Sequence, residues 1–577
     1  MLEIKYHDGL ARIGILHTEH GKIELPVFCP VINPNKLIVE PKEMARRFKA
    51  KMIMANSYII FKHPDLREAA LRYRIHRLLK FKGAIMVDNG GYQIHRYRGV
   101  EIDFAEILKF QEEIGADIGI TLDLPTPASA GRREAKRSVE ITLQNARESL
   151  KLMRRKNMLW SAPIQGGKFL DLISKCAKEL SRLPYAMHSL GEPVQFLNNY
   201  EFTQVCYMVH AAKSKLPISR AFHLFGVGLP SFMPLATLLG CDIFDSASYA
   251  LFASDDRYMT DIGTLRLEEM QELPCNCEIC SRYDIKELKE MLKGERERLL
   301  ALHNLYVLFK VIKEIREAII ENRLFELCAV RCRSHPRLFE AYLKALRIFS
   351  KLFDKYDPMR KRSGLFYTGE ETKLRPEIRR AKMRVRRIFG TKLIPAALDQ
   401  TYPFFQSLSI EGKPLFKFSK GIVKDLERIR KIADYQFGRG IGRVLFPGNV
   451  KIFKSPTTGK IRRIYSDSEL LATLRPRDGF LCLRIAGALR IKDKLKNNRV
   501  FVEGKPEVEE LVRSGRNLFV KFVERADPNI LPRDEVLILN SKNELLGVGE
   551  AVLSSEEMKV MQRGVAVKTR EGLKLQR

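Results

Sequence analysis

The chain has 577 residues, more than one hydrophobic core can organise, so about three to four domains are expected. Lys and Arg outnumber Asp and Glu by 101 to 69, and this net charge of +32 predicts a polyanionic partner, nucleic acid first; the alternative is the basic richness of a heat-adapted proteome. No run reaches the about eighteen apolar residues of a membrane span, which excludes an integral membrane protein.

The cysteines and the N-terminus predict the compartment. Most of the ten cysteines stand alone within apolar runs, as Cys29, Cys176 and Cys206 do, which argues against a disulfide framework. The first residues, MLEIKYHDGLARIG, lack the apolar segment of a secretory signal. We therefore expect a cytoplasmic protein with no membrane partner.

Short apolar runs alternate with segments of helical period from the start of the chain to about residue 250. The helical segments, such as Phe104–Ile114 and Arg132–Arg154, repeat apolar residues three or four apart. This alternation predicts an α/β protein with a (β/α)8 TIM-type barrel, and a doubly wound open sheet is the alternative. The eight predicted strands are Leu25–Asn33, Lys51–Tyr58, Ala84–Asp88, Asp117–Asp123, Met158–Gln165, Tyr185–Gly191, Ala221–Gly228 and Cys241–Ser246.

Polar residues or glycines follow seven of these strands. The chemistry of such barrels collects at the C-terminal ends of the strands, so these residues are expected to face one site. A single Asp or Gly at a strand end is more often a turn residue, but seven such ends in register predict a pocket. They are Asn56 to Tyr58, Asp88 to Gln93, Asp123, Gln165 to Gly167, Gly191, Gly226 to Gly228 and Asp245.

The predicted pocket holds two carboxylates from different strands, Asp88 and Asp245. They suit substitution at an acetal-like carbon such as C1′ of a nucleoside, where one attacks and the other handles the proton of the leaving group. Asp123 and Gln165 supply an acceptor and an amide suited to the edge of a purine, and Tyr92 can stack on the base. An extruded nucleobase is therefore the predicted ligand.

A cysteine cluster follows the last predicted strand. Cys275, Cys277 and Cys280 form a CxCxxC pattern, and His303 lies in the helical segment that comes next. Three thiolates and one imidazole are a donor set for tetrahedral Zn2+, and four protein ligands leave no position for a catalytic water. We expect one structural zinc ion in an insertion that fixes the segment after the last strand.

Three regions follow the barrel, which gives four predicted domains. Residues 1–345 are the catalytic barrel with its zinc site, residues 346–425 a basic helical linking domain, and residues 426–497 a small α+β domain. Residues 498–577 contain short alternating strands and resemble the PUA domain, an RNA-binding module. Its candidate phosphate contacts are Lys521, Arg533, Arg563, Lys568 and Arg570.

Several segments in order resemble the tRNA-guanine transglycosylases: LPVFCPVIN, ANSYII, VDNGGYQ, LDLPTP, PIQGG, GVGLP and DIFDSASYALFASDDRYM, the last of which is similar to the archaeal branch. The resemblance covers about residues 5–310 and returns in the C-terminal domain. It implies that guanine at position 15 of the tRNA D-arm is exchanged for 7-cyano-7-deazaguanine (preQ0), the first committed step toward archaeosine. The expected partners are tRNA, preQ0 and guanine, and homodimers are common in the family.

The resemblance also implies roles for individual residues. Asp245, in the FDS motif, corresponds to the nucleophile that forms a covalent aspartyl-ribosyl intermediate, and Asp88 to the general acid/base. Asn89 departs from the family, which usually has the smaller Ser there, and this puts the pocket geometry in question. The family carries the same CxCxxC and downstream His as its zinc ligands. The residues implied to bind the heterocycle are Asp123, Gln165, Gly191 and Tyr92.

Two other functions stay open. A related RNA-modifying protein can keep the barrel and the PUA domain with different chemistry, as archaeosine synthases do without the catalytic residues; the presence of both Asp88 and Asp245 argues against this. A tRNA-binding protein or chaperone without catalysis is the second alternative. Exchange of labelled guanine into tRNA separates both from a transglycosylase.

Overall fold

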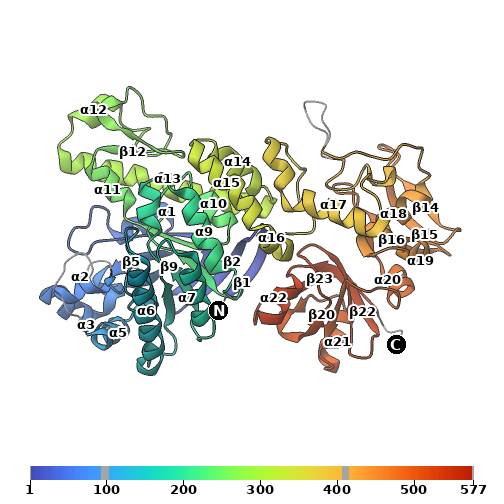
Figure 1. Ribbon diagram of the computed structural model, residues 1–577, viewed down its shortest axis with the longest axis horizontal. Helices are drawn as coiled ribbons and strands as arrows, with labels where there is room; N and C mark the ends of the chain where they lie inside the picture. The colour runs from blue at the N-terminus through green and yellow to red at the C-terminus, as the bar shows by residue number, and fades with distance from the viewer. Residues whose placement is uncertain (1, 92–102, 406–414, 575–577) are drawn as a thin grey trace. The chain divides into compact units, whose positions relative to one another are not determined.

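The computed structural model describes residues 2–91, 103–405 and 415–574, and the chain divides into two compact units (Figure 1). The first unit comprises Ala11–Ala318 and Leu327–Ile348 with the first two residues. The second comprises Glu3–Leu10, Ile319–Glu326 and Phe349–Arg577. The chain therefore enters the second unit three times: near its N-terminus, at the end of the long helix α13 (Lys293–Glu321), and from Phe349 onward.

Eight parallel strands form the centre of the first unit, in the order β4-β11-β10-β9-β8-β7-β6-β5. The two strands at the ends of this order, β4 and β5, are also joined. A parallel bridge connects Val31, just after β4, with Met54 in β5, and Ile32 N–H donates to the Met54 carbonyl at 2.9 Å. The predicted (β/α)8 barrel is confirmed, and the alternative prediction of a doubly wound open sheet is wrong. The strands are β4 (Val27–Pro30), β5 (Met52–Asn56), β6 (Ala84–Asp88), β7 (Ile118–Ile120), β8 (Leu159–Ile164), β9 (Met187–Leu190), β10 (Ala221–Leu224) and β11 (Ile243–Ser246).

Helices cover the outside of this barrel (Figure 1). Nearly every residue of the eight strands is buried, since side chains fill the interior and helices cover the outer face, which is why the strands are near-continuous apolar runs. The helices between the strands include α1 (Pro41–Phe48), α2 (Ser57–Lys62), α3 (Pro64–Leu78), α5 (Phe104–Glu113), α6 (Arg132–Leu152), α7 (Leu170–Ser181), α8 (Pro193–Asn198), α9 (Phe202–Lys213) and α10 (Met233–Leu238), and α11 (Ser248–Ser254) follows the last strand.

Two additions to the barrel carry side chains that matter below. An antiparallel hairpin of β2 (Ala11–Thr18) and β3 (Gly21–Leu25) precedes β4 and is not among the predicted elements. After β11 come the short antiparallel strands β12 (Arg257–Met259) and β13 (Thr264–Arg266), then α12 (Ile285–Glu290) and α13. The remaining helices of this unit are α14 (Leu324–Cys332) and α15 (Pro336–Ile348).

The second unit contains two antiparallel-rich sheets on a shared apolar core. The four-stranded sheet holds β14 (Lys451–Lys454), β15 (Ile461–Ser466), β16 (Glu469–Leu474) and β17 (Leu481–Leu483). The six-stranded sheet holds β18 (Arg499–Val502), β19 (Leu518–Phe519), β20 (Val523–Ala526), β21 (Glu535–Leu539), β22 (Leu545–Ala551) and β23 (Val565–Gly572). Its helices include α16 (Ser350–Tyr356), α17 (Pro376–Phe389), α18 (Asp425–Phe437), α19 (Ile441–Leu445), α20 (Ile485–Ile491), α21 (Pro506–Arg513) and α22 (Ser555–Val560).

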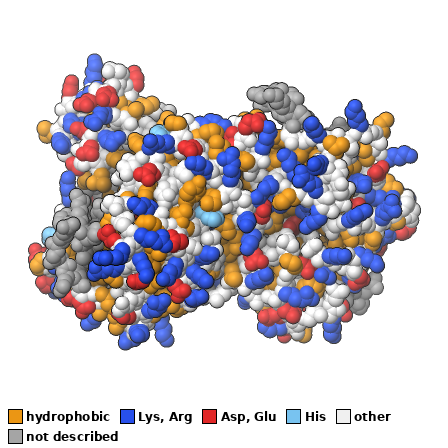
Figure 2. Space-filling view, viewed as in Figure 1, with side chains coloured by type: hydrophobic (Ala, Val, Ile, Leu, Met, Phe, Trp, Pro, Cys, Tyr) orange, Lys and Arg blue, Asp and Glu red, His pale blue; other side chains and the backbone are white. Residues whose placement is uncertain are grey.

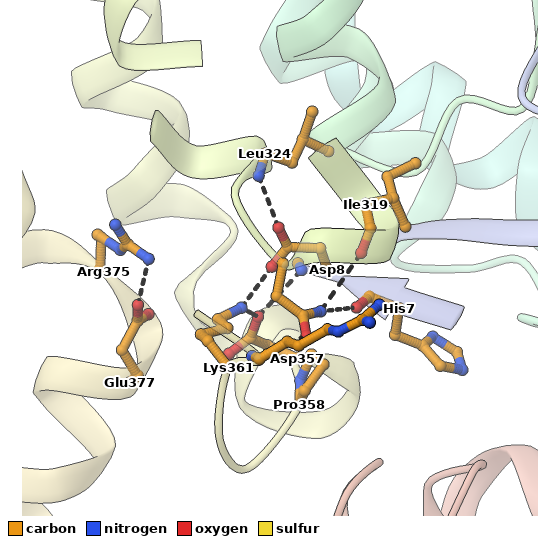
Figure 3. Close-up of polar contacts among 12 residues, drawn as sticks. His7, Asp8, Ile319, Leu324, Asp357, Pro358, Lys361, Arg375 and Glu377 are labelled. Atoms are coloured by element: carbon orange, nitrogen blue, oxygen red, sulfur yellow. Dashed lines mark hydrogen bonds and ion pairs between the residues drawn. The ribbon is translucent and has the colours of Figure 1, made fainter. Parts of the chain in front are cut away.

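A buried ionic network ties the N-terminal residues into the second unit (Figure 3). Lys361 Nζ lies 2.5 Å from Asp8 Oδ1 and also contacts Asp357, and all three side chains are buried. Leu324 N–H donates to Asp8 Oδ2 at 2.7 Å. Removing one partner of such a buried pair leaves an uncompensated charge, which typically costs about 3–5 kcal/mol. The network thus helps to hold Glu3–Leu10 in the second unit rather than the first.

Within the described ranges, no helix is both long enough and apolar enough to cross a membrane. All ten cysteines are free thiols, seven of them buried; the three with partial exposure are Cys275, Cys277 and Cys280.

Candidate active site

Asp88 ends strand β6 and so lies at the C-terminal rim of the barrel. Burial raises the pKa of Asp88 to about 7, and the negative charges of Asp123 and Asp245 raise it as well, against hydrogen bonds from the Asn89 and Gly90 N–H groups. Asn56 Nδ2 donates to Asp88 Oδ2 at 2.8 Å and fixes the carboxyl group. A carboxyl with a pKa near neutrality can donate a proton in one step and accept one in the next.

Asp245 lies in β11 and is buried, with about one-tenth of its side chain exposed. His223 Nε2 lies 2.7 Å from Asp245 Oδ1, and Gly226 N–H donates to the same oxygen at 2.8 Å. Within the described residues both of these bonds reach Oδ1. They position the carboxylate and leave Oδ2 available for a further contact.

A chain of hydrogen bonds continues from His223 into the barrel. Ser189 Oγ lies 3.1 Å from His223 Nδ1, and Ser161 Oγ lies 2.6 Å from Ser189 Oγ. A serine hydroxyl that donates to Nδ1 leaves the proton on Nε2, which then donates to Asp245. Sequence reasoning missed His223, although a fully buried histidine within the apolar strand AFHL was the available signal.

Asp123 follows β7 and is held by two amides. Asn89 Nδ2 donates to Asp123 Oδ1 at 3.0 Å, and Gln165 Nε2 donates to Oδ2 at 2.6 Å. Thr126 N–H donates to Gln165 Oε1 at 3.2 Å and thereby fixes the orientation of that amide. Burial raises the pKa of Asp123 although both amide bonds oppose the shift.

Asn89 has a definite place in this arrangement. It is buried, its Nδ2 also donates to the Thr121 carbonyl at 2.6 Å, and Gly91 N–H donates to its Oδ1 at 2.6 Å. The larger side chain therefore bridges the ends of two strands rather than filling the pocket.

Gly191 follows β9 and packs against the amide of Gln165. A Cβ atom at Gly191 would come within 2.3 Å of Gln165 Nε2, so only glycine leaves that amide in place. The next residue, Glu192, was also missed by sequence reasoning: burial, followed by the charge of Asp123, raises its pKa to about 7. Gln195 Nε2 donates to Glu192, which opposes this shift.

The structure thus brings five of the six predicted catalytic and base-binding residues to one rim: Asp88, Asp123, Gln165, Gly191 and Asp245. The sixth, Tyr92, lies outside the described residues. The rim combines one proton-exchanging carboxyl, one positioned carboxylate and a hydrogen-bonding edge, which suits displacement at a carbon that carries a heterocycle.

The four predicted metal ligands form a separate cluster. Cys277 and Cys280 have their Sγ atoms 3.6 Å apart, and each lies 3.4 Å from His303 Nδ1. One donor atom from each of Cys275, Cys277, Cys280 and His303 lies within 4.8 Å of the others. The edges of a Cys3His tetrahedron are about 3.6–3.8 Å for ordinary zinc–sulfur and zinc–nitrogen bonds, so the donor set fits a tetrahedral metal ion.

Second-sphere contacts orient the histidine of this cluster. His303 Nε2 lies 2.8 Å from the Met259 carbonyl, which fixes Nδ1 as the ligand nitrogen. The Tyr258 ring stacks on His303 at 3.8 Å, and its hydroxyl lies 3.3 Å from Cys280 Sγ. The cluster joins the β12 region to α13.

The fold is a (β/α)8 barrel whose C-terminal rim gathers three carboxyl groups, which is the arrangement of a barrel enzyme. The queuine tRNA-ribosyltransferase family matches residues 8–337, the patch-forming domain C2 of tRNA-guanine transglycosylase matches residues 427–498, and the PUA domain matches residues 502–573. The first match covers more than half of the chain. The chain therefore belongs to the tRNA-guanine transglycosylase family and is a glycosyl-transferring enzyme.

Full-length relatives agree with this assignment. The chain is 44% identical over 584 residues to the tRNA-guanine(15) transglycosylase of Pyrococcus furiosus, covering 99% of this chain and 98% of the relative. It is 42% identical over 583 residues to the protein of the same name from Thermococcus kodakarensis, with 99% of both chains covered. The Methanothermobacter thermautotrophicus protein of that name is 38% identical over 654 residues, again with 99% of both covered.

Proposed function

We propose that the protein exchanges the guanine at position 15 of tRNA for preQ0, the first step of archaeosine formation, in the cytoplasm. Relatives that share its full length carry the name tRNA-guanine(15) transglycosylase. The observation that carries the proposal is the pairing of two carboxyls on one rim: Asp88, with a pKa of about 7, and Asp245, held through one oxygen only.

In the first half-reaction Asp245 Oδ2 attacks C1′ of the target nucleoside. The bond from C1′ to the guanine nitrogen breaks, Asp88 donates its proton to the departing base, and an aspartyl-ribosyl ester forms. His223 and Gly226 keep Oδ1 in place throughout. The attack needs an ionised Asp245 beside a protonated Asp88, which is the division of states that two neighbouring carboxyls favour.

In the second half-reaction preQ0 takes the place of guanine. Its ring nitrogen attacks C1′, the ester bond to Asp245 breaks, and the nitrogen's proton passes to Asp88, which restores the starting state. Water has to be kept from the ester during the exchange of bases. The step consumes no ATP and no redox cofactor because one glycosidic bond replaces another.

Asp123, Gln165 and Gly191 are proposed to hold the edge of the heterocycle, and Tyr92 to stack on it. Asp123 supplies acceptor oxygens for the N–H groups of a guanine-like edge, and the Gln165 amide is preset by Thr126. The Asp123–Gln165 bond of 2.6 Å satisfies both groups when no base is bound. A base that offers N–H donors to Asp123 can share or replace this bond.

The Cys3His cluster is proposed to bind one structural Zn2+. Zinc would supply a tetrahedral crosslink, because four protein ligands leave no position for an activated water. Cys275, Cys277 and Cys280 would hold it as thiolates, with His303 as the fourth ligand. The ion would then fasten the segment after β11 to α13 and take no part in base exchange.

A basic cavity in the second unit supports tRNA as the macromolecular partner. The cavity of about 350 Å3 is lined by six basic side chains and one acidic one. Arg533 illustrates the crowding: burial and the charge of Arg360 lower its pKa to about 10, even though Asn322 Oδ1 accepts from it at 2.7 Å. Figure 2 shows further Lys and Arg side chains on the displayed face. The basic residues of the cavity are Lys5, His7, Arg362, Arg477, Arg533 and Lys568.

The test is incorporation of labelled guanine or preQ0 into tRNA by wild-type protein and by Asp245→Asn. The wild-type protein should incorporate both, whereas Asp245→Asn should lose about 10³-fold or more of the rate while binding tRNA with unchanged affinity. Wild-type protein that binds tRNA but exchanges neither base would instead identify a tRNA-binding protein without catalysis.

A further inference from the structure

A second group of metal-ligand side chains lies at the N-terminal rim of the barrel, opposite to the active-site rim. His20 lies in the turn between β2 and β3, His76 in the last turn of α3, and Asp117 directly before β7. One donor atom from each residue lies within 4.8 Å of the other two. Three elements that are far apart in the sequence therefore bring two imidazoles and a carboxylate together.

The two imidazoles contact different oxygens of the same carboxylate. His20 Nδ1 lies 2.9 Å from Asp117 Oδ1, and His76 Nε2 lies 2.9 Å from Asp117 Oδ2. The rings are stacked, with centroids 3.6 Å apart and planes inclined by 25°. One donor atom from each residue lies within reach of a single ion. Because imidazole nitrogens bind in the ring plane, the stacked rings have to rotate apart for both to ligate it, and the partly exposed His20 side chain is the one with room to turn.

Asp117 is already fixed in the form that a metal requires. Ile85 N–H donates to Oδ2 at 2.8 Å and His20 N–H donates to Oδ1 at 2.9 Å, which leaves one lone pair on each oxygen for a metal or an imidazole N–H. Burial would raise the pKa of Asp117, but hydrogen bonds from His76, Ile85 and His20 outweigh it and hold the pKa below its ordinary value. The two backbone N–H groups thus fix the orientation of the carboxylate toward the two imidazoles.

The backbone departs from a regular helix two residues before His76. Arg74 has φ 68° and ψ 156° within α3, a conformation that non-glycine residues rarely adopt. After this break Ile75 N–H donates to the Ile114 carbonyl at 2.8 Å, and the last turn points His76 at Asp117. A regular helix through residue 74 would direct His76 elsewhere.

We propose that His20, His76 and Asp117 form a binding site for a divalent transition metal, with Zn2+ as the ion best matched to two imidazoles and a carboxylate. About one-third of the His20 side chain is exposed, so one side of the site is open for entry of the ion and for a water ligand. The bound ion crosslinks the β2–β3 turn, the end of α3 and the start of β7. The site is independent of the proposed base exchange and of the Cys3His cluster.

The test is metal content at a fixed free Zn2+ concentration. Full-length wild-type protein, His20→Gln, His76→Gln and the control His63→Gln are stripped with a weak chelator, dialysed against buffered Zn2+, and analysed by plasma mass spectrometry for zinc and iron. His63 is an exposed histidine at the start of the same helix, where its side chain makes no capping bond. Circular dichroism verifies that each variant is folded.

Wild-type protein and His63→Gln should each bind about two zinc ions per chain, and His20→Gln and His76→Gln about one, because only the Cys3His cluster remains in these two variants. Added Zn2+ should also raise the unfolding temperature of wild-type protein more than that of His20→Gln. Equal zinc content in all four proteins, with equal shifts in unfolding temperature, would overturn the proposal and leave Asp117 as an acceptor of four hydrogen bonds.

Discussion

The two rims of the barrel hold aspartates in opposite electrostatic states. On the C-terminal rim burial and neighbouring carboxylates raise the pKa of Asp88 to about 7. On the N-terminal rim Asp117 accepts four hydrogen bonds that hold its pKa below the ordinary value. Before β11 on the same rim, Arg12 donates from Nε and Nη2 to the two oxygens of Asp242 at 2.9 and 2.7 Å.

The difference between Asp88 and Asp117 indicates that the two rims of one barrel have different tasks, one in stabilising the fold and the other in the reaction. At the N-terminal rim hydrogen bonds from three elements hold the pKa of Asp117 below its ordinary value, so this carboxylate joins those elements together. At the C-terminal rim burial raises the pKa of Asp88 and of Asp123, so these two carboxyls are costly to ionise. In a barrel of this kind the first rim is expected to serve folding and the second catalysis.

The largest expected effect is at Asp88. Asp88→Asn removes the proton donor while it keeps the size of the side chain, so base exchange should fall by about 10²–10⁴-fold with tRNA affinity unchanged. Single-turnover incorporation of labelled guanine measures the loss. Activity within about tenfold of wild type would show that another group handles the proton.

The pH dependence of the same reaction tests the raised pKa directly. Departure of guanine needs protonated Asp88, so kcat/KM should fall by about tenfold per pH unit above about 7. The raised pKa of Asp88 also makes the stability of the fold depend on pH. The stability that this group contributes is present below its ordinary pKa of 3.8 and is lost as the pH rises through about 7. Asp88→Asn should therefore unfold at the same or a higher temperature than wild type at pH 8.

Asp117→Asn should have the opposite outcome. It replaces an ionised acceptor of four hydrogen bonds by an amide with one acceptor oxygen, which should cost about 3 kcal/mol of unfolding free energy. Denaturant unfolding in the presence of a chelator measures this cost without a metal contribution. Exchange by the folded fraction should continue at the wild-type rate. A stable but inactive Asp117→Asn protein would contradict the division between the rims.

A smaller effect is expected at His223, which positions Asp245 without touching the substrate. His223→Leu should lower kcat by about 10–100-fold and change KM for tRNA by less than about twofold, because misplacement of a reacting group affects the chemical step. His223→Gln, which can still donate to Oδ1, should recover part of the rate. Equal loss in both variants would indicate that the histidine acts only through packing.

Sequence patterns predicted the barrel and most of its active rim for a physical reason. Buried parallel strands appear in the sequence as apolar runs. Polar residues at the ends of these runs, such as Asp88 and Asp123, are therefore easy to recognise. The cysteine spacing likewise predicted the cluster of Cys275, Cys277, Cys280 and His303. The proposed division into four domains stays a prediction.

The missed features depend on contacts that no local pattern records. His223 lies inside an apolar strand, and its partner is on the neighbouring strand, where Ile243 pairs with His223 and Asp245 follows two residues later. His20 and His76 meet at Asp117 only because α3 breaks at Arg74. Contacts of this kind can be found only when the pairing register of the strands and the path of the backbone are known.

The most direct test of the central claim is to trap the covalent intermediate. Protein is incubated with tRNA in the absence of preQ0, denatured, digested with protease and nuclease, and analysed by mass spectrometry for a ribosyl-linked peptide. We expect an adduct on Asp245 in wild-type protein. An adduct on Asp88 instead would reverse the two roles and contradict the account.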